Sequence, residues 1–350
     1  MSNGPLRIEQ YETVRYDINC NPLGVPDSVT RAIMENISAV GRYPDTYYDP
    51  LRNAIASYAC CAPEHLVLGS GSSDLLRLFV ALLAPKKALL PIPSATDYEH
   101  VLSVYGCETD FYELDINQDY HLDMDDFIAH LSDTYDIVIL GNPNNPTSQL
   151  ISKADIEKLA AACKELGIAL LLDEMYIEFT ENYERNTAIS LVNTYDNLII
   201  LRSVSKFFSV PGLRLAYAIM NNETNMTIIN MTATPNSISC LTAAACTAML
   251  EDTYIHESHS RIFTERNLIY AAMNTNKNLR LFKPSANFAL MQILKEDVTA
   301  KSLLAHCNLK GIVLRNCENF HGLDSHFVRF SIMNPMQNDL MVNTILELLR

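Results

Sequence analysis

The sequence predicts an α/β fold with a mostly parallel sheet between helices, followed by a smaller α+β unit at the C-terminus. In the middle of the chain, short apolar runs alternate with stretches whose apolar residues recur at helical spacing. Some runs, such as residues 168–174 and 197–203, are apolar almost without interruption, as in strands buried on both faces. After about residue 235 the pattern changes to one long helical stretch followed by three strand-like runs.

The individual elements follow from their boundaries. Strands of the large sheet are expected at residues 65–71, 87–93, 136–143, 168–174 and 197–203. Helices are expected at residues 72–84 and 152–167, and the second has a serine N-cap, an acidic first turn and a glycine stop. The C-terminal unit should contain a helix from about 250 to 280 and strands at 287–293, 311–317 and 326–332. We therefore expect an N-terminal arm at 1–30, a large domain at 31–240 and a small domain at 241–350.

Composition limits the possible functions. The chain has 350 residues, 48% of them hydrophobic, and a formal net charge of -15, which argues against nucleic-acid binding or adhesion to anionic membranes. No apolar run approaches the roughly 20 residues of a membrane span, and the first residues lack a signal-peptide pattern. The nine cysteines form no C-x-x-C pair, so we expect them to be reduced and mostly buried, in a cytoplasmic protein that needs no metal.

Polar residues gather where four of the expected strands end. In open α/β sheets, ligands bind beyond the carboxyl ends of the strands. The small residues of "GSGSSD" (69–74) suit a phosphate at a helix N-terminus. The other candidates are Asn145, Asp173, Tyr176, Ser203, Ser205, Lys206 and Arg214. Taken singly, each fits a helix cap, a turn or a solvated surface residue, but a lysine and a carboxylate at the ends of buried strands together indicate a site.

One cofactor requires this whole set. Pyridoxal 5′-phosphate (PLP) has an aldehyde that needs a lysine, a ring nitrogen that needs a carboxylate, and a ring hydroxyl that needs donors. Its phosphate needs backbone N–H groups, hydroxyls and an arginine. The sequence therefore predicts a buried lysine that is covalently used, with phosphate ligands beside it.

Three motifs carry a family resemblance. "NNPTS", "DEMYIEF" and "SVSKFFSVPGLR" resemble the signature of fold type I PLP-dependent aminotransferases, in the branch of histidinol-phosphate aminotransferase and threonine-phosphate decarboxylase. The resemblance extends from "NCNPLGVP" (19–26) through "RYPD" (42–45) to "FVRFS" (327–331). It implies a large domain built on the mostly parallel, seven-stranded sheet typical of this fold type. It also implies a homodimer with shared active sites.

The resemblance also implies a role for each residue. Lys206 would form a Schiff base with the cofactor and move a proton at the substrate α-carbon, and Asp173 would pair with the ring nitrogen. Asn145 and Tyr176 would contact the ring hydroxyl. The phosphate ligands would be Ser72, Ser73, Ser203, Ser205, Arg214 and Tyr43 of the second subunit. The substrate, a small amino acid or amine, would meet Asn21, Asn287 and Arg329.

The sequence departs from the family pattern at Ala95, where an aromatic residue usually stacks on the cofactor, and at Ser148, where glycine is usual. Residues 313–331 resemble the decarboxylases, but the His-Gly-Gly segment of those enzymes is absent.

We therefore expect an aminotransferase acting on an amino acid or a phosphorylated amine, with decarboxylation of O-phospho-L-threonine or O-phosphoserine as the alternative. A catalytically inactive binding protein is disfavoured by Lys206 and Asp173, and a dehydrogenase by the lack of a G-x-G-x-x-G motif.

Overall fold

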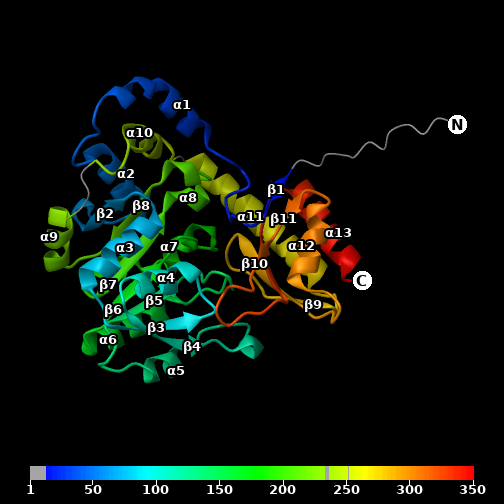
Figure 1. Cartoon of the computed structure of the whole chain (residues 1–350). Coiled ribbons are helices and arrows are strands. Elements are labelled where there is room, and N and C mark those ends of the chain that lie inside the picture. Colours follow the sequence, from blue (N-terminus) through cyan, green and yellow to red (C-terminus); the bar gives the residue numbers. More distant parts are fainter. Residues whose placement is uncertain (1–12, 233–235, 251) are drawn as a thin grey trace.

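The computed structural model describes residues 13–232, 236–250 and 252–350, and within them one large sheet, one smaller sheet and a two-stranded pair are covered by helices (Figure 1). The start of the predicted arm, residues 1–12, lies outside the described residues. Among the helices of the described part, none combines the length and the apolar character that crossing a bilayer requires.

The large sheet contains seven strands within the described residues, in the order β2-β8-β7-β6-β5-β3-β4. Neighbours from β7 to β4 are parallel, whereas β8 runs antiparallel to both β7 and β2. The strands are β2 (Leu66–Gly69), β3 (Lys87–Ile92), β4 (Glu108–Glu113), β5 (Ile137–Gly141), β6 (Ala169–Asp173), β7 (Leu198–Ser203) and β8 (Ala216–Ile219). The predicted fold class, a mostly parallel sheet in an α/β protein, is confirmed.

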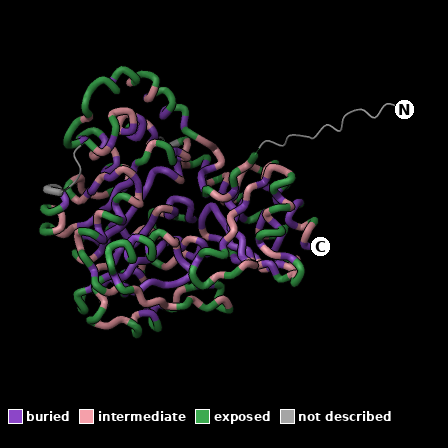
Figure 2. Tube along the Cα trace, in the orientation of Figure 1, coloured by how far each residue is buried: buried purple, intermediate pink, exposed green. Residues whose placement is uncertain are grey.

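Helices cover both faces of this sheet. Successive side chains along its strands therefore pack into two separate hydrophobic cores, one on each face. Leu170 and Leu172 of β6 belong to one core together with Leu159 of α6, and Leu171 belongs to the other together with Phe79 of α3. Figure 2 shows the central strands as a buried band between more exposed helices. The helices of this part are α1 (Asp27–Glu35), α2 (Asp49–Ala59), α3 (Ser72–Leu83), α4 (Thr96–Val104), α5 (Met124–Ala129), α6 (Lys153–Glu165), α7 (Tyr183–Asn186), α8 (Val204–Phe207), α9 (Glu223–Thr232) and α10 (Cys240–Ala248). Burial on both faces explains why the central strands appear in the sequence as continuous apolar runs.

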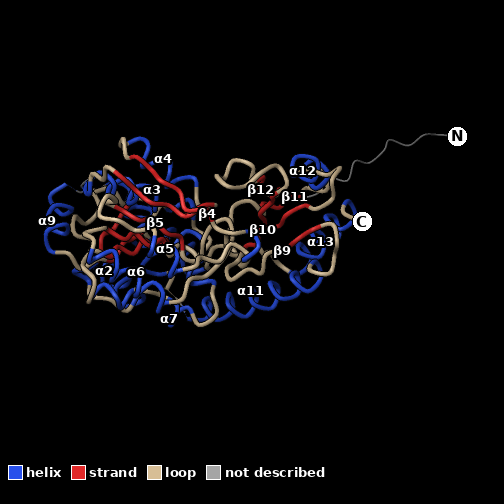
Figure 3. Tube along the Cα trace, turned by 90° about the horizontal axis from the view of Figure 1, so that it is seen from below, coloured by secondary structure: helices blue, strands red, loops and turns tan. Residues whose placement is uncertain are grey.

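The smaller sheet has the order β12-β13-β10-β9, with antiparallel neighbours, and lies apart from the large sheet (Figure 3). Its strands are β9 (Leu279–Leu281), β10 (Phe288–Ile293), β12 (Arg315–Asn316) and β13 (Phe327–Ser331). The helices here are α11 (Asp252–Met273), α12 (Ala300–Asn308) and α13 (Pro335–Leu348). The predicted α+β character after residue 235 is confirmed, whereas the exact domain bounds stay a prediction.

The N-terminal segment joins the C-terminal part of the chain. Strand β1 (Val14–Arg15) pairs in parallel with β11 (Ile312–Val313). The expected strand at 311–317 is therefore two short strands, β11 and β12, which separate at Leu314 and pair with different partners. As predicted, all nine cysteines are free, and most of them are buried.

Candidate active site

A cavity of about 250 Å³ opens at the carboxyl ends of the parallel strands. The strand register places Gly141 of β5 beside Asp173 of β6, and Asp173 beside Leu201 of β7, so the loops after these strands meet at one edge. The predicted residues that line the cavity are Ser72, Ser73, Asn145, Asp173, Tyr176, Ser203, Ser205, Lys206 and Arg214. Residues far apart in the sequence are thus brought together where an open α/β sheet binds its ligand.

One end of the cavity is suited to an anion. Helix α3 begins after Gly71, whose φ of 105° is strained for other residues, and the Arg214 guanidinium occupies the space where a β-carbon on Gly71 would lie. Within the described residues, no carboxylate lies within ion-pair distance of Arg214, whose guanidinium donates only to the Pro211 carbonyl oxygen, at 3.3 Å. The Ser203 and Ser205 hydroxyls are hydrogen-bonded to each other at 2.8 Å. An unneutralised arginine over a helix N-terminus with hydroxyls nearby is a site for a phosphate.

Lys206 lies next to this anion site, in the short helix α8 that follows β7 directly. Its Nζ donates a hydrogen bond to the Ile18 carbonyl oxygen at 2.7 Å. The prediction of a buried lysine was wrong in degree: Lys206 is half-buried, because its side chain extends into the open cavity. A primary amine held in an accessible cavity beside an anion site can react with an aldehyde.

Asp173 is the last residue of β6, lines the cavity and is almost completely buried. The Tyr98 hydroxyl donates to Asp173 Oδ2 at 2.7 Å, and the Met175 backbone N–H donates to Oδ1 at 2.9 Å. Burial raises the pKa of the Asp173 carboxyl to about 6, while these two hydrogen bonds act to lower it. The carboxylate is thus a buried acceptor that suits a protonated ring nitrogen.

Arg329 of the smaller sheet contacts Asn145, which lines the cavity. Arg329 of β13 donates from Nη1 to Asn145 Oδ1 and from Nη2 to the Asp17 carbonyl oxygen at 2.8 Å. Its Nε is buried and has no partner among the described residues. The Tyr176 hydroxyl accepts from Asn19 Nδ2 at 3.4 Å. The smaller sheet therefore presents a buried cation directly to the turn that carries Asn145.

Four predicted residues do not line the cavity: Arg329, Asn21, Asn287 and Tyr43. Asn21 and Asn287 are buried, and their side-chain amides donate hydrogen bonds to backbone groups. Asn21 donates to the Phe207 carbonyl oxygen at 2.8 Å, and Asn287 donates to the Asn19 carbonyl oxygen at 3.0 Å. Both contacts fix the segment next to Lys206, whose carbonyl oxygen accepts from the Asn21 backbone N–H. Tyr43 is 86% exposed and lies outside the cavity of its own chain.

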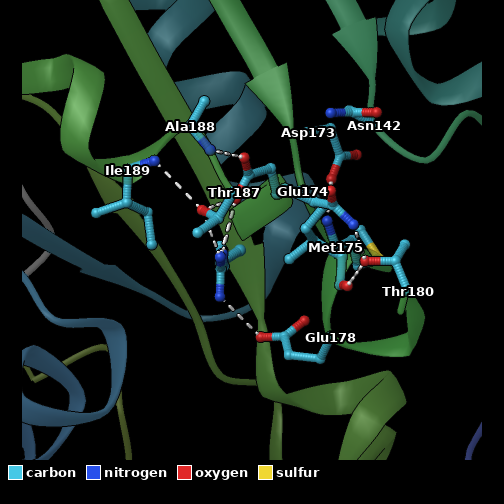
Figure 4. A network of polar contacts seen from close by, with 12 residues as sticks. Asn142, Asp173, Glu174, Met175, Glu178, Thr180, Thr187, Ala188 and Ile189 are labelled. Atoms are coloured by element: carbon cyan, nitrogen blue, oxygen red, sulfur yellow. Dashed lines mark hydrogen bonds and ion pairs between the residues drawn. The ribbon is translucent and has the colours of Figure 1, made fainter. Parts of the chain in front are cut away.

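A buried ionic network lies next to the site, between β7 and the segment after β6 (Figure 4). Arg202 lies between Glu174 and Glu178, with Nη2 at 2.9 Å from Glu174 Oε2 and Nη1 at 3.1 Å from Glu178 Oε1. Glu174 also accepts from the Ala188 backbone N–H at 2.7 Å. In Figure 4 the side chains of Asp173 and Glu174 point away from each other, as successive residues do at a strand end. The network thus anchors the segment after β6 and leaves Asp173 facing the cavity.

Sequence reasoning missed two residues of this region. Tyr98 was not among the expected site residues, but it lies in the first turn of α4 and donates a hydrogen bond to Asp173. Arg315 is the cross-strand partner of Arg329 in the small sheet. The three-residue step from Ala95, which lines the cavity, to Tyr98 is one helical turn, and this signal could have placed Tyr98 on the same side.

The fold and the cavity together define an α/β enzyme built for PLP. The anion site, the lysine amine and the buried carboxylate match the phosphate, the aldehyde and the ring nitrogen of that cofactor. Comparison with known proteins identifies the family. The profile described as "Aminotransferase class I and II" matches residues 12–345.

Relatives of two activities match almost the whole chain. The threonine-phosphate decarboxylase of Salmonella typhimurium is 28% identical over 345 residues, which cover 98% of this chain and 93% of that protein. The histidinol-phosphate aminotransferase of Methanosphaera stadtmanae is 26% identical over 348 residues, which cover 97% and 92%. The solved structure of the histidinol-phosphate aminotransferase from Clostridium acetobutylicum is 33% identical, with a TM-score of 0.88 and coverage of 96% of this chain and 98% of that one.

The chain belongs to the aminotransferase class I and II family and has the fold of the type I PLP enzymes. It is a PLP-dependent enzyme, an aminotransferase or a related decarboxylase. When bound, the cofactor supplies an electron sink for the charge left by breaking a bond to the substrate α-carbon.

Proposed function

We propose that the chain is an aminotransferase that acts on an amino acid or a phosphorylated amine. The observation that carries this proposal is the convergence of the Lys206 amine, the Asp173 carboxylate and the Arg214 anion site on one cavity. Each group suits a different part of one cofactor, and the anion site supports an orientation with the phosphate at that end of the cavity.

In this proposal each group has one task. Lys206 would hold the cofactor covalently, and its amine would move a proton between the substrate α-carbon and the cofactor carbon that bears the aldehyde. Asp173 holds the ring nitrogen in its protonated form through a charged hydrogen bond. Asn145 and Tyr176 hold the ring hydroxyl, and Ala95 leaves one face of the ring without an aromatic neighbour. The phosphate is held by the α3 N-terminus with Ser72, Ser73, Ser203, Ser205 and Arg214.

Arg329 is proposed to bind an anionic group of the substrate. Its unpartnered Nε and its contact with Asn145, which lines the cavity, support this role. Asn21 and Asn287 contribute indirectly, since they hold the segment that carries the Ile18 and Asn19 carbonyl groups.

A second candidate function, decarboxylation of an O-phospho amino acid, is favoured by Arg315. Its Cα is the register partner of Arg329, and within the described residues its side chain has no acidic partner and donates to Asn319 Oδ1 at 2.8 Å. Two arginines on neighbouring strands suit a substrate with two anionic groups, a carboxylate and a phosphate. O-phospho-L-threonine and O-phospho-L-serine carry both.

We further propose that the enzyme is a cytoplasmic homodimer. The free cysteines fit a reducing compartment. Exposed apolar side chains cluster from α1 onwards, among them Met34 at 71%, Val40 at 64% and Tyr43 at 86% exposure. Such a patch suits burial against a second copy, which would bring Tyr43 to the partner's phosphate site.

Product analysis separates the two candidate functions. The purified protein, supplied with PLP, is incubated with histidinol phosphate and 2-oxoglutarate, or with O-phospho-L-threonine alone, and amino transfer and carbon dioxide release are followed side by side. We expect amino transfer from the first substrate. Carbon dioxide release from the second, without amino transfer, would replace the aminotransferase proposal by the decarboxylase. Other amino acids serve as further amino donors, and no reaction with any of them would contradict both.

A further inference from the structure

The contact between Tyr98 and Asp173 joins two elements that are far apart in sequence. Tyr98 is only 3% exposed, and its hydroxyl reaches Asp173 Oδ2 at 2.7 Å across 75 positions of the chain. Both residues line the cavity. The hydroxyl lies close to the end of β5, where a β-carbon on Gly141 would be 3.4 Å from it. The phenol is therefore held in place by its surroundings and directed at one carboxylate oxygen.

The hydrogen-bond pattern leaves Asp173 little freedom. Oδ1 accepts from the Met175 backbone N–H at 2.9 Å, so the two donors hold the two carboxylate oxygens from different elements. A carboxylate held at both oxygens cannot rotate about its terminal bond without losing a hydrogen bond. Its remaining lone pairs face the cavity in one orientation.

The two donors also oppose the effect of burial on charge. The pKa of the Asp173 carboxyl is raised to about 6 chiefly by burial; the charges of Asp97 and Glu174 also raise it, and the hydrogen bonds from Tyr98 and Met175 lower it. Burial and the nearby Asp173 charge raise the pKa of the Tyr98 phenol well above its usual range. Tyr98 therefore keeps its proton and acts as a donor throughout the physiological pH range.

We infer that Tyr98 is a positioning residue that holds the Asp173 carboxylate ionised and aimed at the protonated ring nitrogen of PLP. This inference rests on the proposed pairing of Asp173 with that nitrogen. Tyr98, a residue of α4, also belongs to the core that includes residues of α3, so its simpler role would be to fill space. The two roles differ in one respect: only the positioning role depends on the ring nitrogen of the ligand.

The test compares PLP with its 1-deaza analogue, in which a C–H group replaces the ring nitrogen. Dissociation constants of both ligands are measured by absorbance titration for the wild type, Tyr98→Phe and Tyr112→Phe. Tyr112 is the matched control, because its hydroxyl also donates to an aspartate, Asp126, at 2.7 Å, but at the surface. The measured quantity is the preference for PLP over the analogue, which a general loss of packing would leave unchanged.

We expect the wild type and Tyr112→Phe to prefer PLP equally, and Tyr98→Phe to lose about tenfold of that preference, as for one hydrogen bond to a charged group. Tyr98→Gln, whose amide can still donate, should retain more of the preference than Tyr98→Phe. It also serves as the test variant if Tyr98→Phe does not fold. If the Tyr98 variants weaken both ligands equally, Tyr98 is a packing residue and the inference is wrong, while the cofactor assignment stands. If the wild type itself shows no preference, the proposed role of Asp173 fails first.

Discussion

Asp173 combines two properties that oppose each other in an ordinary protein core. It is buried, which disfavours its charge, yet it is aimed into a cavity and held by two donors. A buried carboxylate without a cationic partner costs folding free energy, and this cost is typical of functional sites. The cationic partner is expected to be the ring nitrogen of the cofactor.

The Asp173→Asn variant tests the electronic role of this residue. An amide retains the shape of the carboxylate but cannot hold the ring nitrogen protonated by charge. We expect PLP to remain bound and turnover to fall on the order of 10³-fold, as for other groups that stabilise transition-state charge. Steady-state kinetics with saturating PLP measure this, and turnover within a few-fold of the wild type would refute the role.

The same substitution should stabilise the protein without cofactor. The pKa of Asp173 is about 6 in the folded state and about 3.9 in an unfolded chain, so the folded state binds the proton more tightly. The free energy of unfolding therefore falls as the pH rises from about 4 to about 6, and the cost persists above this range. We expect cofactor-free Asp173→Asn to be about 1–3 kcal/mol more stable than the wild type at pH 8. Urea unfolding at pH 8 and pH 4 should show this gain disappearing at the lower pH, and a gain that does not depend on pH would contradict the assigned cause.

At the scale of elements, the site depends on how α3 begins. Gly71 allows the Arg214 guanidinium to lie directly over the first turn of the helix. Gly167 has a comparable positive φ of 75°, but the space around its missing β-carbon is open. Comparing an alanine substitution at each glycine therefore distinguishes the cost of backbone strain from the effect of displacing Arg214.

Gly71→Ala should weaken PLP binding, and Gly167→Ala should not. Both substitutions carry a backbone cost because alanine disfavours positive φ, about 1–2 kcal/mol in the left-handed helical region and about 1–3 kcal/mol at the φ of 105° and ψ of 159° of Gly71. Only the first pushes Arg214 out of place, so we expect at least a tenfold higher dissociation constant for PLP. Absorbance titration and thermal unfolding of both variants check the two effects separately. Equal PLP affinities would contradict the proposed phosphate site.

The elements that sequence analysis predicted are those whose signal is local. Strands β5, β6 and β7 are buried on both faces and appear as nearly continuous apolar runs. β4 was missed because it is an edge strand with partly exposed polar residues. β8 was missed because it is short and no turn signal in the sequence marks where it begins. The split of 311–317 at Leu314 depends on pairing partners that the sequence does not reveal.

In the candidate site, too, the residues that could be predicted are those with a local signal in the sequence. Residues directly after buried strands, such as Asp173 and Lys206, could be assigned because strand ends meet at one edge of a parallel sheet. Tyr98 and Arg315 act through tertiary contacts, a hydrogen bond between α4 and β6 and a cross-strand pairing, and neither has a local signature. Asn21 and Asn287 were assigned to the substrate from resemblance alone, and their amides are directed at backbone carbonyl groups.

For the whole molecule, the main proposal is a shared active site. Tyr43 is exposed in its own chain, and its neighbours in the sequence include other exposed apolar residues such as Val40 and Tyr47, as expected for an interface. Inactive Lys206→Ala subunits are mixed with weakened Tyr43→Phe subunits and allowed to exchange. In a hybrid dimer with shared sites, one site lacks both groups and the other is intact, so activity should rise above that of either parent. Each parent mixed with itself is the control, and an absence of recovery despite proven hybrids would contradict the shared site.

The central claim is that Lys206 carries PLP in the cavity at the ends of β5, β6 and β7. Borohydride reduction of the loaded protein, followed by peptide mass mapping, tests it most directly. We expect a visible absorption band before reduction and a single reduced adduct on Lys206, with no adduct on this peptide in Lys206→Ala. A reduced adduct on a different lysine of the wild type would contradict the assignment of the site.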